Sequence, residues 1–174
     1  MDKIIHIVSH ILQNSPNGQK RLDLAKLIYY CDGVYFQKHA KIISQQKFMH
    51  MEDCPLPLDL DRTILYMKNN GYIDVKPEIN NNNGLSGFLL YHVQDAGDFL
   101  DKEEKRVIKK VMEAFKRGVR DESKQYPNLY ENYVITNLFS EITFSIDTLN
   151  TKIHFFKRKS LLQLSGKIFR ILFS

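Results

Sequence analysis

The chain has 174 residues, with 25 Lys and Arg against 20 Asp and Glu, which gives a formal net charge of +5. This length suits one domain, or one domain with an extension, and is enough to enclose a hydrophobic core. With 43% hydrophobic and 26% charged residues, the composition excludes disordered, collagen-like and disulfide-rich chains. No apolar stretch approaches the roughly 20 residues that a transmembrane helix needs.

The net positive charge is confined to the C-terminal end of the sequence. Residues 1–144 hold 19 basic and 19 acidic residues, whereas residues 145–174 hold six basic residues and one acidic residue. Because phosphate-binding surfaces need an excess of Lys and Arg, this balance argues against nucleic acid as a partner of the body. We predict a domain over residues 1–144 and a basic extension over residues 145–174.

The first half of the sequence has the periodicity of α-helices. Apolar residues recur at helical spacing over residues 2–13 and 20–39, and the run Ser-Pro-Asn-Gly at 15–18 separates the two segments. A third helix is predicted over residues 58–70, with Gly71 as its C-terminal stop.

Extended segments are predicted on both sides of this third helix. Residues 48–51 are a short apolar stretch, and two prolines exclude a helix over residues 54–57. Residues 72–76 and 88–93 are strand-like and flank the Asn- and Gly-rich run 80–84, which predicts a β-hairpin.

Two further helices are predicted in the second half. Asp101 and Glu104 have the spacing of a capping box, and the helix that follows extends to about residue 119. Pro127 opens a fifth helix. Residues 142–156 fit either a strand or a loop.

The last periodic segment, residues 159–173, is predicted to be a basic amphipathic helix. Its apolar arc has to be buried against the body, a groove on a partner, a second copy of the chain or an anionic membrane surface. The arc comprises Leu161, Leu162, Leu164, Ile168, Phe169, Ile171, Leu172 and Phe173. The basic surface of the tail comprises Lys157, Arg158, Lys159, Lys167 and Arg170.

Together these elements predict a mainly α fold (α+β), all-α apart from one hairpin. We expect a compact domain of about five helices with that small β-hairpin, followed by the C-terminal amphipathic helix. The N-terminus lacks the features of a signal peptide. Cys31 and Cys54 form no CxxC pair, so we expect free thiols in the cytoplasm, with peripheral membrane contact through the tail as an option.

No set of residues with catalytic or metal-binding spacing emerges from the sequence. His6 and His10 share a helix face, but the Glu of the zinc-protease helix and a third ligand are missing. The order Cys-Pro at residues 54–55, without a second Cys, does not fit a zinc deaminase. We therefore predict no enzyme activity, no metal and no cofactor.

Several motifs recur in the order and spacing of one known family. They are LAKLIYYCDG at residues 24–33, CPLP at 54–57 ahead of a helix, NGYI at 70–73, and FLDKEE at 99–104 ahead of the next helix. Over about residues 4–118 the chain resembles the SocA-like, Panacea domain family, known from prophage-associated proteins and type II toxin–antitoxin systems. Cys54 stands where the family has Gly.

This resemblance implies a mainly helical, non-catalytic domain that acts by protein binding. Family members neutralise a cognate toxin directly or act as proteolytic adaptors that deliver it to a protease. We therefore expect an antitoxin with a toxin, and in the adaptor case a protease, as its partner. The sequence leaves the oligomeric state open.

The aromatic residues of the second helix are candidates for partner binding, because Tyr is frequent at binding hot spots. They are Tyr29, Tyr30, Tyr35 and Phe36. At helical spacing the same residues also fit a hydrophobic core. Two alternative functions remain, a DNA-binding transcriptional regulator that uses the helices and hairpin, and a membrane-peripheral protein that uses the basic tail.

Overall fold

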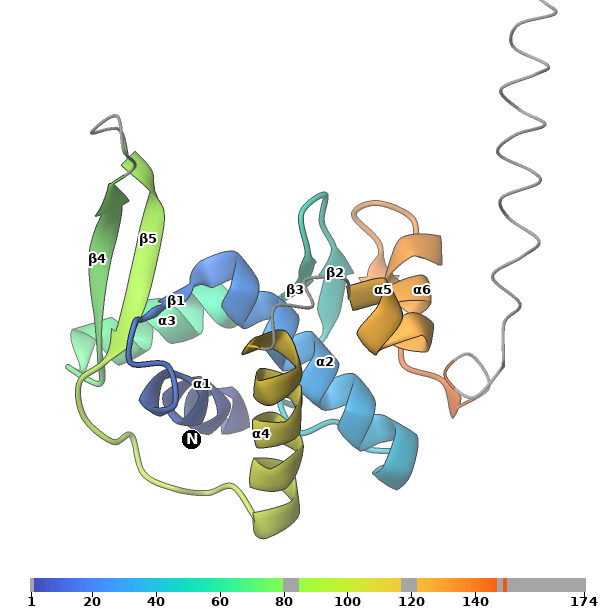
Figure 1. Cartoon of the computed structure of the whole chain (residues 1–174), viewed down its shortest axis with the longest axis horizontal. Helices are drawn as coiled ribbons and strands as arrows, with labels where there is room; N and C mark the ends of the chain where they lie inside the picture. Colours follow the sequence, from blue (N-terminus) through green and yellow to red (C-terminus); the bar gives the residue numbers. More distant parts are fainter. Residues whose placement is uncertain (1, 80–84, 117–121, 147–148, 150–174) are drawn as a thin grey trace, which may run out of the picture.

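A computed structural model describes residues 2–79, 85–116, 122–146 and 149 (Figure 1). The helices are α1 (Lys3–Gln13), α2 (Arg21–His39), α3 (Leu60–Asn69), α4 (Lys102–Lys116), α5 (Glu122–Gln125) and α6 (Pro127–Ile135). The strands are β1 (Gln19–Lys20), β2 (Phe48–His50), β3 (Pro55–Pro57), β4 (Ile73–Ile79), β5 (Leu85–His92) and β6 (Glu141–Ile142). The five helices predicted from periodicity and capping are confirmed, and α5 is an addition.

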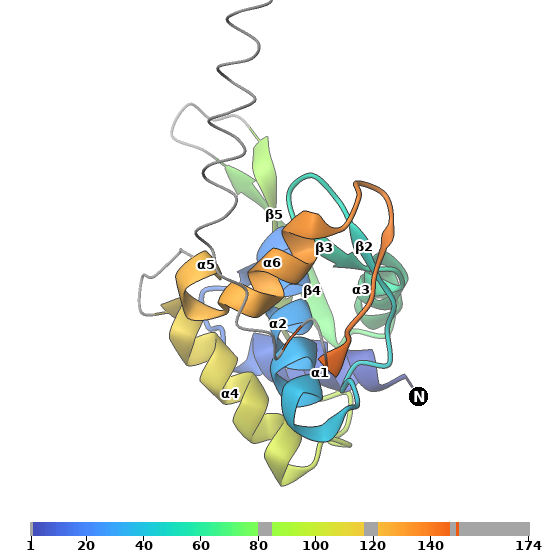
Figure 2. The same cartoon turned by 90° about the vertical axis from the view of Figure 1, so that its right-hand side faces the viewer.

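Helix α2 lies at the centre of the fold, with the other helices arranged around it (Figures 1 and 2). Its residues Leu24, Ile28 and Cys31 have no exposed surface, because they face neighbours on several sides. Helix α1 supplies Ile4, Ile7, Val8 and Ile11, which are equally buried and continue the same core.

Two small antiparallel sheets flank the helices. The predicted hairpin is confirmed as β4–β5, and β1 extends it to three strands in the order β1-β5-β4. A second sheet has the order β3-β2-β6. The predicted α+β class is therefore confirmed, whereas the all-α description is wrong, because the fold contains two sheets. Strands of two or three residues are too short for alternating hydrophobicity to reveal.

A buried carboxylate fixes the connection between α2 and β2. Asp32 on α2 has no exposed surface and accepts hydrogen bonds from the backbone N–H groups of Ile43 at 2.8 Å and Ser44 at 2.9 Å. The Ser44 hydroxyl also donates to Asp32. Helix α2 ends at His39, and the φ of 51° at Ala40 turns the chain back towards this carboxylate.

The residues after α5 pack back onto α2. Leu129 on α6 packs closely against Gly33 on α2, and a Cβ atom at Gly33 would be 2.2 Å from Leu129 Cδ2. Phe144 stacks on Tyr29 with ring centroids 5.3 Å apart, and Leu149 is only 1% exposed. The folded unit thus includes Phe144 and Leu149, and the division at residue 144 stays a prediction.

The capping box that opens α4 is confirmed. Asp101 Oδ1 accepts a bond from the backbone N–H of Glu104 at 2.8 Å, and Glu104 Oε2 accepts one from the N–H of Asp101 at 2.9 Å. We expect Asp101→Ala to lower the free energy of unfolding by about 1 kcal/mol, measured by chemical denaturation. Glu113→Ala is the control, because it removes an exposed carboxylate of the same helix, well beyond the first turn that the capping box stabilises. Equal losses in the two variants would contradict the assignment.

Candidate protein-binding surface

Two of the four aromatic candidates on α2 are core residues. Tyr29 and Tyr30 have no exposed surface. The Tyr29 hydroxyl donates to the backbone carbonyl of Leu129 at 2.9 Å, and the Tyr30 hydroxyl donates to Glu122 Oε2 at 3.1 Å. Their side chains therefore hold α5 and α6 against α2, and they offer no surface to a partner in this structure.

The other two candidates are half-buried. Tyr35 stacks on His39 with ring centroids 4.2 Å apart, and Phe36 stacks on Phe144 at 5.7 Å. Partner binding by Tyr35 and Phe36 stays a prediction. The basic tail candidates lie outside the described residues, and these are Lys157, Arg158, Lys159, Lys167 and Arg170.

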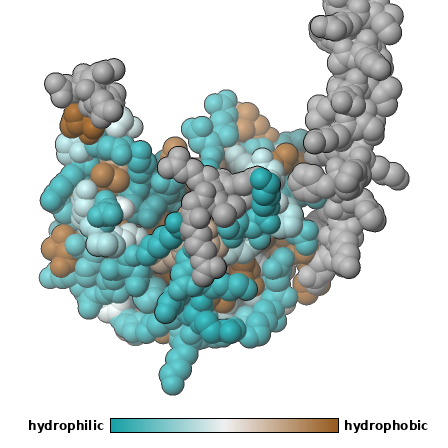
Figure 3. Space-filling model, in the orientation of Figure 1, coloured by the Kyte–Doolittle hydropathy of each residue, from teal (hydrophilic) through white to brown (hydrophobic). Residues whose placement is uncertain are grey.

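A cavity of about 340 Å³ lies where the start of α2, the β2–β3 turn and the loop after α6 meet. Most of its lining residues are apolar, and the most exposed of them is Phe139, at 62%. Figure 3 shows apolar atoms at the surface near the β2–β3 turn and α6. We call this region the Phe139 surface, and its residues are Arg21, Leu22, Met51, Glu52, Asp53, Cys54, Leu56 and Phe139.

The loop that carries Phe139 is tied firmly to β2. The Phe139 N–H donates to the carbonyl of His50 at 2.8 Å, and the His50 N–H donates to the carbonyl of Ser140 at 2.9 Å. Phe139 has a φ of 62°. This left-handed conformation costs a residue with a large side chain about 1–3 kcal/mol. The structure thus holds an exposed aromatic ring in place at an energetic cost, which is typical of functional positions.

A second set of contacts links α6 to the β2–β3 turn. The Tyr133 hydroxyl donates to the carbonyl of Met51 at 2.6 Å, and the His50 ring Nδ1 lies 2.6 Å from the carbonyl oxygen of Thr136. These bonds join the two edges of the Phe139 surface through the body. We therefore expect the surface to keep its shape when a partner binds.

The Phe139 surface has a negative local charge. Arg21 is held by Asp61, with bonds of 2.5 Å and 2.7 Å to the two carboxylate oxygens, and this pairing lowers the pKa of Asp61. Glu52 and Asp53 are exposed, and neither carboxylate has an ion-pair partner within the described ranges. Two unpaired negative charges therefore border an apolar depression, which favours a partner with apolar and basic side chains.

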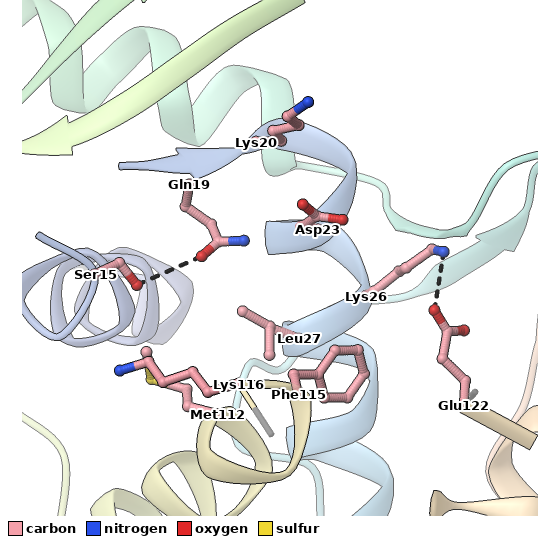
Figure 4. Close-up of a pocket in the computed structure, with 10 residues that line it drawn as sticks. All are labelled: Ser15, Gln19, Lys20, Asp23, Lys26, Leu27, Met112, Phe115, Lys116 and Glu122. Atoms are coloured by element: carbon pink, nitrogen blue, oxygen red, sulfur yellow. Dashed lines mark hydrogen bonds and ion pairs between the residues drawn. The ribbon is translucent and has the colours of Figure 1, made fainter. Parts of the chain in front are cut away.

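A larger cavity of about 540 Å³ lies between α1, the start of α2 and the end of α4 (Figure 4). Its three lysines are already engaged. Lys26 Nζ pairs with Glu122 Oε1 at 2.9 Å, Lys20 pairs with Glu78, and Lys116 donates to a backbone carbonyl. Ser15 and Gln19 form a further hydrogen bond at 3.4 Å. Because its basic groups are already engaged, this cavity is a weaker candidate for binding than the Phe139 surface.

The cysteines and histidines form no reactive or metal-binding cluster within the described part of the chain. Cys31 and Cys54 are free and buried, as expected, and burial raises the pKa of both thiols. A raised pKa keeps a thiol protonated and unreactive. His6 packs on Phe99, and its Nδ1 lies 3.0 Å from the carbonyl oxygen of Gly97.

The basic residues on the outer face of α4 are partly neutralised. Lys105 pairs with Asp98, Arg106 pairs with Glu103, and Lys116 Nζ donates to the carbonyl of Asn14. Such engaged side chains contribute little to phosphate binding. DNA binding through the helices stays a prediction.

Fold and surface together define a small α+β domain with a candidate contact face for another macromolecule. Residues 24–126 match the family model described as "Antitoxin SocA-like, Panacea domain". The match covers more than half of the chain, so the protein belongs to this family, and the resemblance seen in the sequence is confirmed. No curated protein and no solved structure matches the chain.

Family membership supports an antitoxin-type role and a protein partner such as a toxin. Of the helices described, none has the length and hydrophobicity to cross a membrane. The matched segment contains the β2–β3 turn but neither Leu22 nor Phe139. Sequence reasoning missed the Phe139 surface because residues 21–22, 51–56 and 139 meet only in the fold, and no periodic signal could have revealed it.

Proposed function

We propose that this protein is an antitoxin that neutralises its toxin by direct contact through the Phe139 surface. The observation that carries the proposal is the exposed ring of Phe139, on a strained left-handed backbone, beside an apolar cavity with unpaired acidic residues. Family membership supplies the class of partner.

The chemistry of the surface suits a protein partner. Phe and Met are enriched at protein interfaces, and both contribute here, as Phe139 and Met51. The acidic side chains of Glu52 and Asp53 select a partner whose apolar contact is bordered by Lys or Arg. A toxin surface with basic residues around an apolar side chain has this character.

The test is binding of the full chain to the toxin encoded next to it. We expect Phe139→Ala to weaken the complex about 30-fold or more, because a central aromatic anchor contributes at least about 2 kcal/mol. Calorimetry on the purified pair measures the change, and growth after co-expression reports neutralisation.

Phe88→Ala is the matched control, since Phe88 is a 52% exposed ring on the β4–β5 hairpin, across the molecule from α6 (Figure 1). It should leave both affinity and growth unchanged. Equal effects of the two substitutions, or the absence of a toxic neighbour that binds, would refute the proposal.

Delivery of the toxin to a protease would begin with the same binding step. The toxin level during co-expression separates the two mechanisms. Direct neutralisation leaves the amount of toxin unchanged while growth recovers, whereas an adaptor lowers the toxin level. We expect the first result.

A further inference from the structure

The last described residue, Leu149, lies beside α6. Its carbonyl accepts hydrogen bonds from Asn128 Nδ2 at 2.5 Å and Gln37 Nε2 at 3.5 Å, which fix the position of Leu149. Asn128 lies in the first turn of α6, and Phe139 lies in the loop that follows its last turn. The nine residues of α6 rise by about 13 Å. The anchor and the Phe139 surface thus lie near opposite ends of one short helix.

The remaining chain, residues 150–174, is long enough to reach this surface. Its 25 residues would span about 37 Å as a helix. It contains six basic residues and no acidic residue, and the sequence predicts that its apolar residues share one face. It therefore combines the apolar and basic chemistry that the Phe139 surface favours.

Apolar exposure continues from the Phe139 surface onto α6. Leu138 and, on α6, Val134 and Ile135 are each between 41% and 44% exposed. Together with Phe139 they offer a partner more apolar area than the cavity alone. An amphipathic segment needs such an area together with opposite charge, which Glu52 and Asp53 provide.

We infer that residues 150–174 cover the Phe139 surface in the free protein, with their apolar face on Phe139 and their basic residues towards Glu52 and Asp53. The regulatory consequence rests on the proposed function, because the toxin then has to displace this tail. A tethered segment has a millimolar effective concentration, so even a weak contact keeps the surface occupied.

The contact itself is tested on the full chain without a toxin, by amide hydrogen exchange across residues 160–173. We expect these amides to be protected in the wild type. Phe139→Asp should speed their exchange at least tenfold, and so should the double substitution Glu52→Lys with Asp53→Lys. Because the two acids are exposed, the charge reversal does not threaten folding. Phe88→Asp on the hairpin is the control and should change nothing.

The inference is overturned if the tail amides exchange freely in the wild type or if the surface substitutions do not affect their protection. It is likewise overturned if protection grows with protein concentration, which would indicate a second copy. Protection that appears only with phosphatidylserine vesicles would also overturn it and assign the tail to a membrane.

The regulatory step has a separate readout in toxin binding. Leu164→Ser with Ile168→Ser removes two residues of the apolar arc, and we expect it to tighten binding about tenfold by freeing the surface. Gln163→Ser, on the opposite side of the predicted helix, should have no effect. If the amides respond as expected but no toxin binds, the proposed function fails while the tail contact stands.

Discussion

Asp32→Ala is expected to lower the free energy of unfolding by about 3–5 kcal/mol at pH 5. The substitution leaves the N–H groups of Ile43 and Ser44 and the Ser44 hydroxyl without their acceptor. Ile43 and Ser44 are each 1% exposed, so water cannot replace the lost bonds. Each unsatisfied buried group costs about 1–3 kcal/mol. Chemical denaturation of the purified variants measures the loss.

Asp32→Asn is the matched control, because the amide oxygen still accepts from both N–H groups and the NH₂ group can donate to the Ser44 hydroxyl. We expect it to cost no more than about 1–2 kcal/mol. If the Ala and Asn variants were equally unstable, the hydrogen bonds of Asp32 would not be the cause.

Comparison of the wild type with the Asp32→Asn protein also tests an expected pH dependence of stability. Burial raises the pKa of Asp32 to about 7, whereas an unfolded Asp has a pKa near 3.9. Between these values the folded state binds one more proton than the unfolded state, so stability falls as the pH rises from about 4 to about 7. The loss is at most about 4 kcal/mol. The Asp32→Asn protein should lack this component, and identical pH profiles would contradict the assignment.

Periodicity and local chemistry were sufficient to predict the helices and the β4–β5 hairpin. The spacing of apolar residues predicts a helix reliably where the segment is long, as in α2 and α4. The capping pair of Asp101 and Glu104 is a local signal that marks the start of α4. Gly71, with a φ of 74°, ends α3 as expected.

The parts that escaped prediction depend on contacts between distant residues. Tyr29 and Tyr35 look alike in the sequence, but only Tyr29 faces α6 and is buried, because α2 has neighbours on more than one side. Phe139 is held in its exposed position by a bond to His50, a residue 89 positions earlier. Cys54, at a position where the family has Gly, has no positive φ, so the turn there needs no Gly.

The family match ends at residue 126, yet α6 completes the core of the domain. Gly33 on α2 makes this possible, because the absence of a side chain lets Leu129 approach the helix. Gly33→Ala is therefore expected to destabilise the protein by about 1–3 kcal/mol, the usual range for an overpacked core. In an ordinary helix interior the same substitution stabilises a protein by about 1 kcal/mol. A loss of stability in Gly33→Ala, in place of a gain, would therefore support the close contact with Leu129.

A double-mutant cycle with Leu129→Ala isolates this contact. Leu129 is 1% exposed, and Leu129→Ala alone should cost about 2–5 kcal/mol because it leaves a cavity. In the double variant the new methyl group at position 33 occupies part of that cavity, so we expect a total loss at least about 1 kcal/mol smaller than the sum of the single losses. Denaturation midpoints and slopes of the four proteins give the coupling energy, and additive losses would contradict the contact. Since α6 leads directly into the Phe139 loop, Gly33→Ala should also weaken toxin binding, and Leu129→Ala should partly restore it.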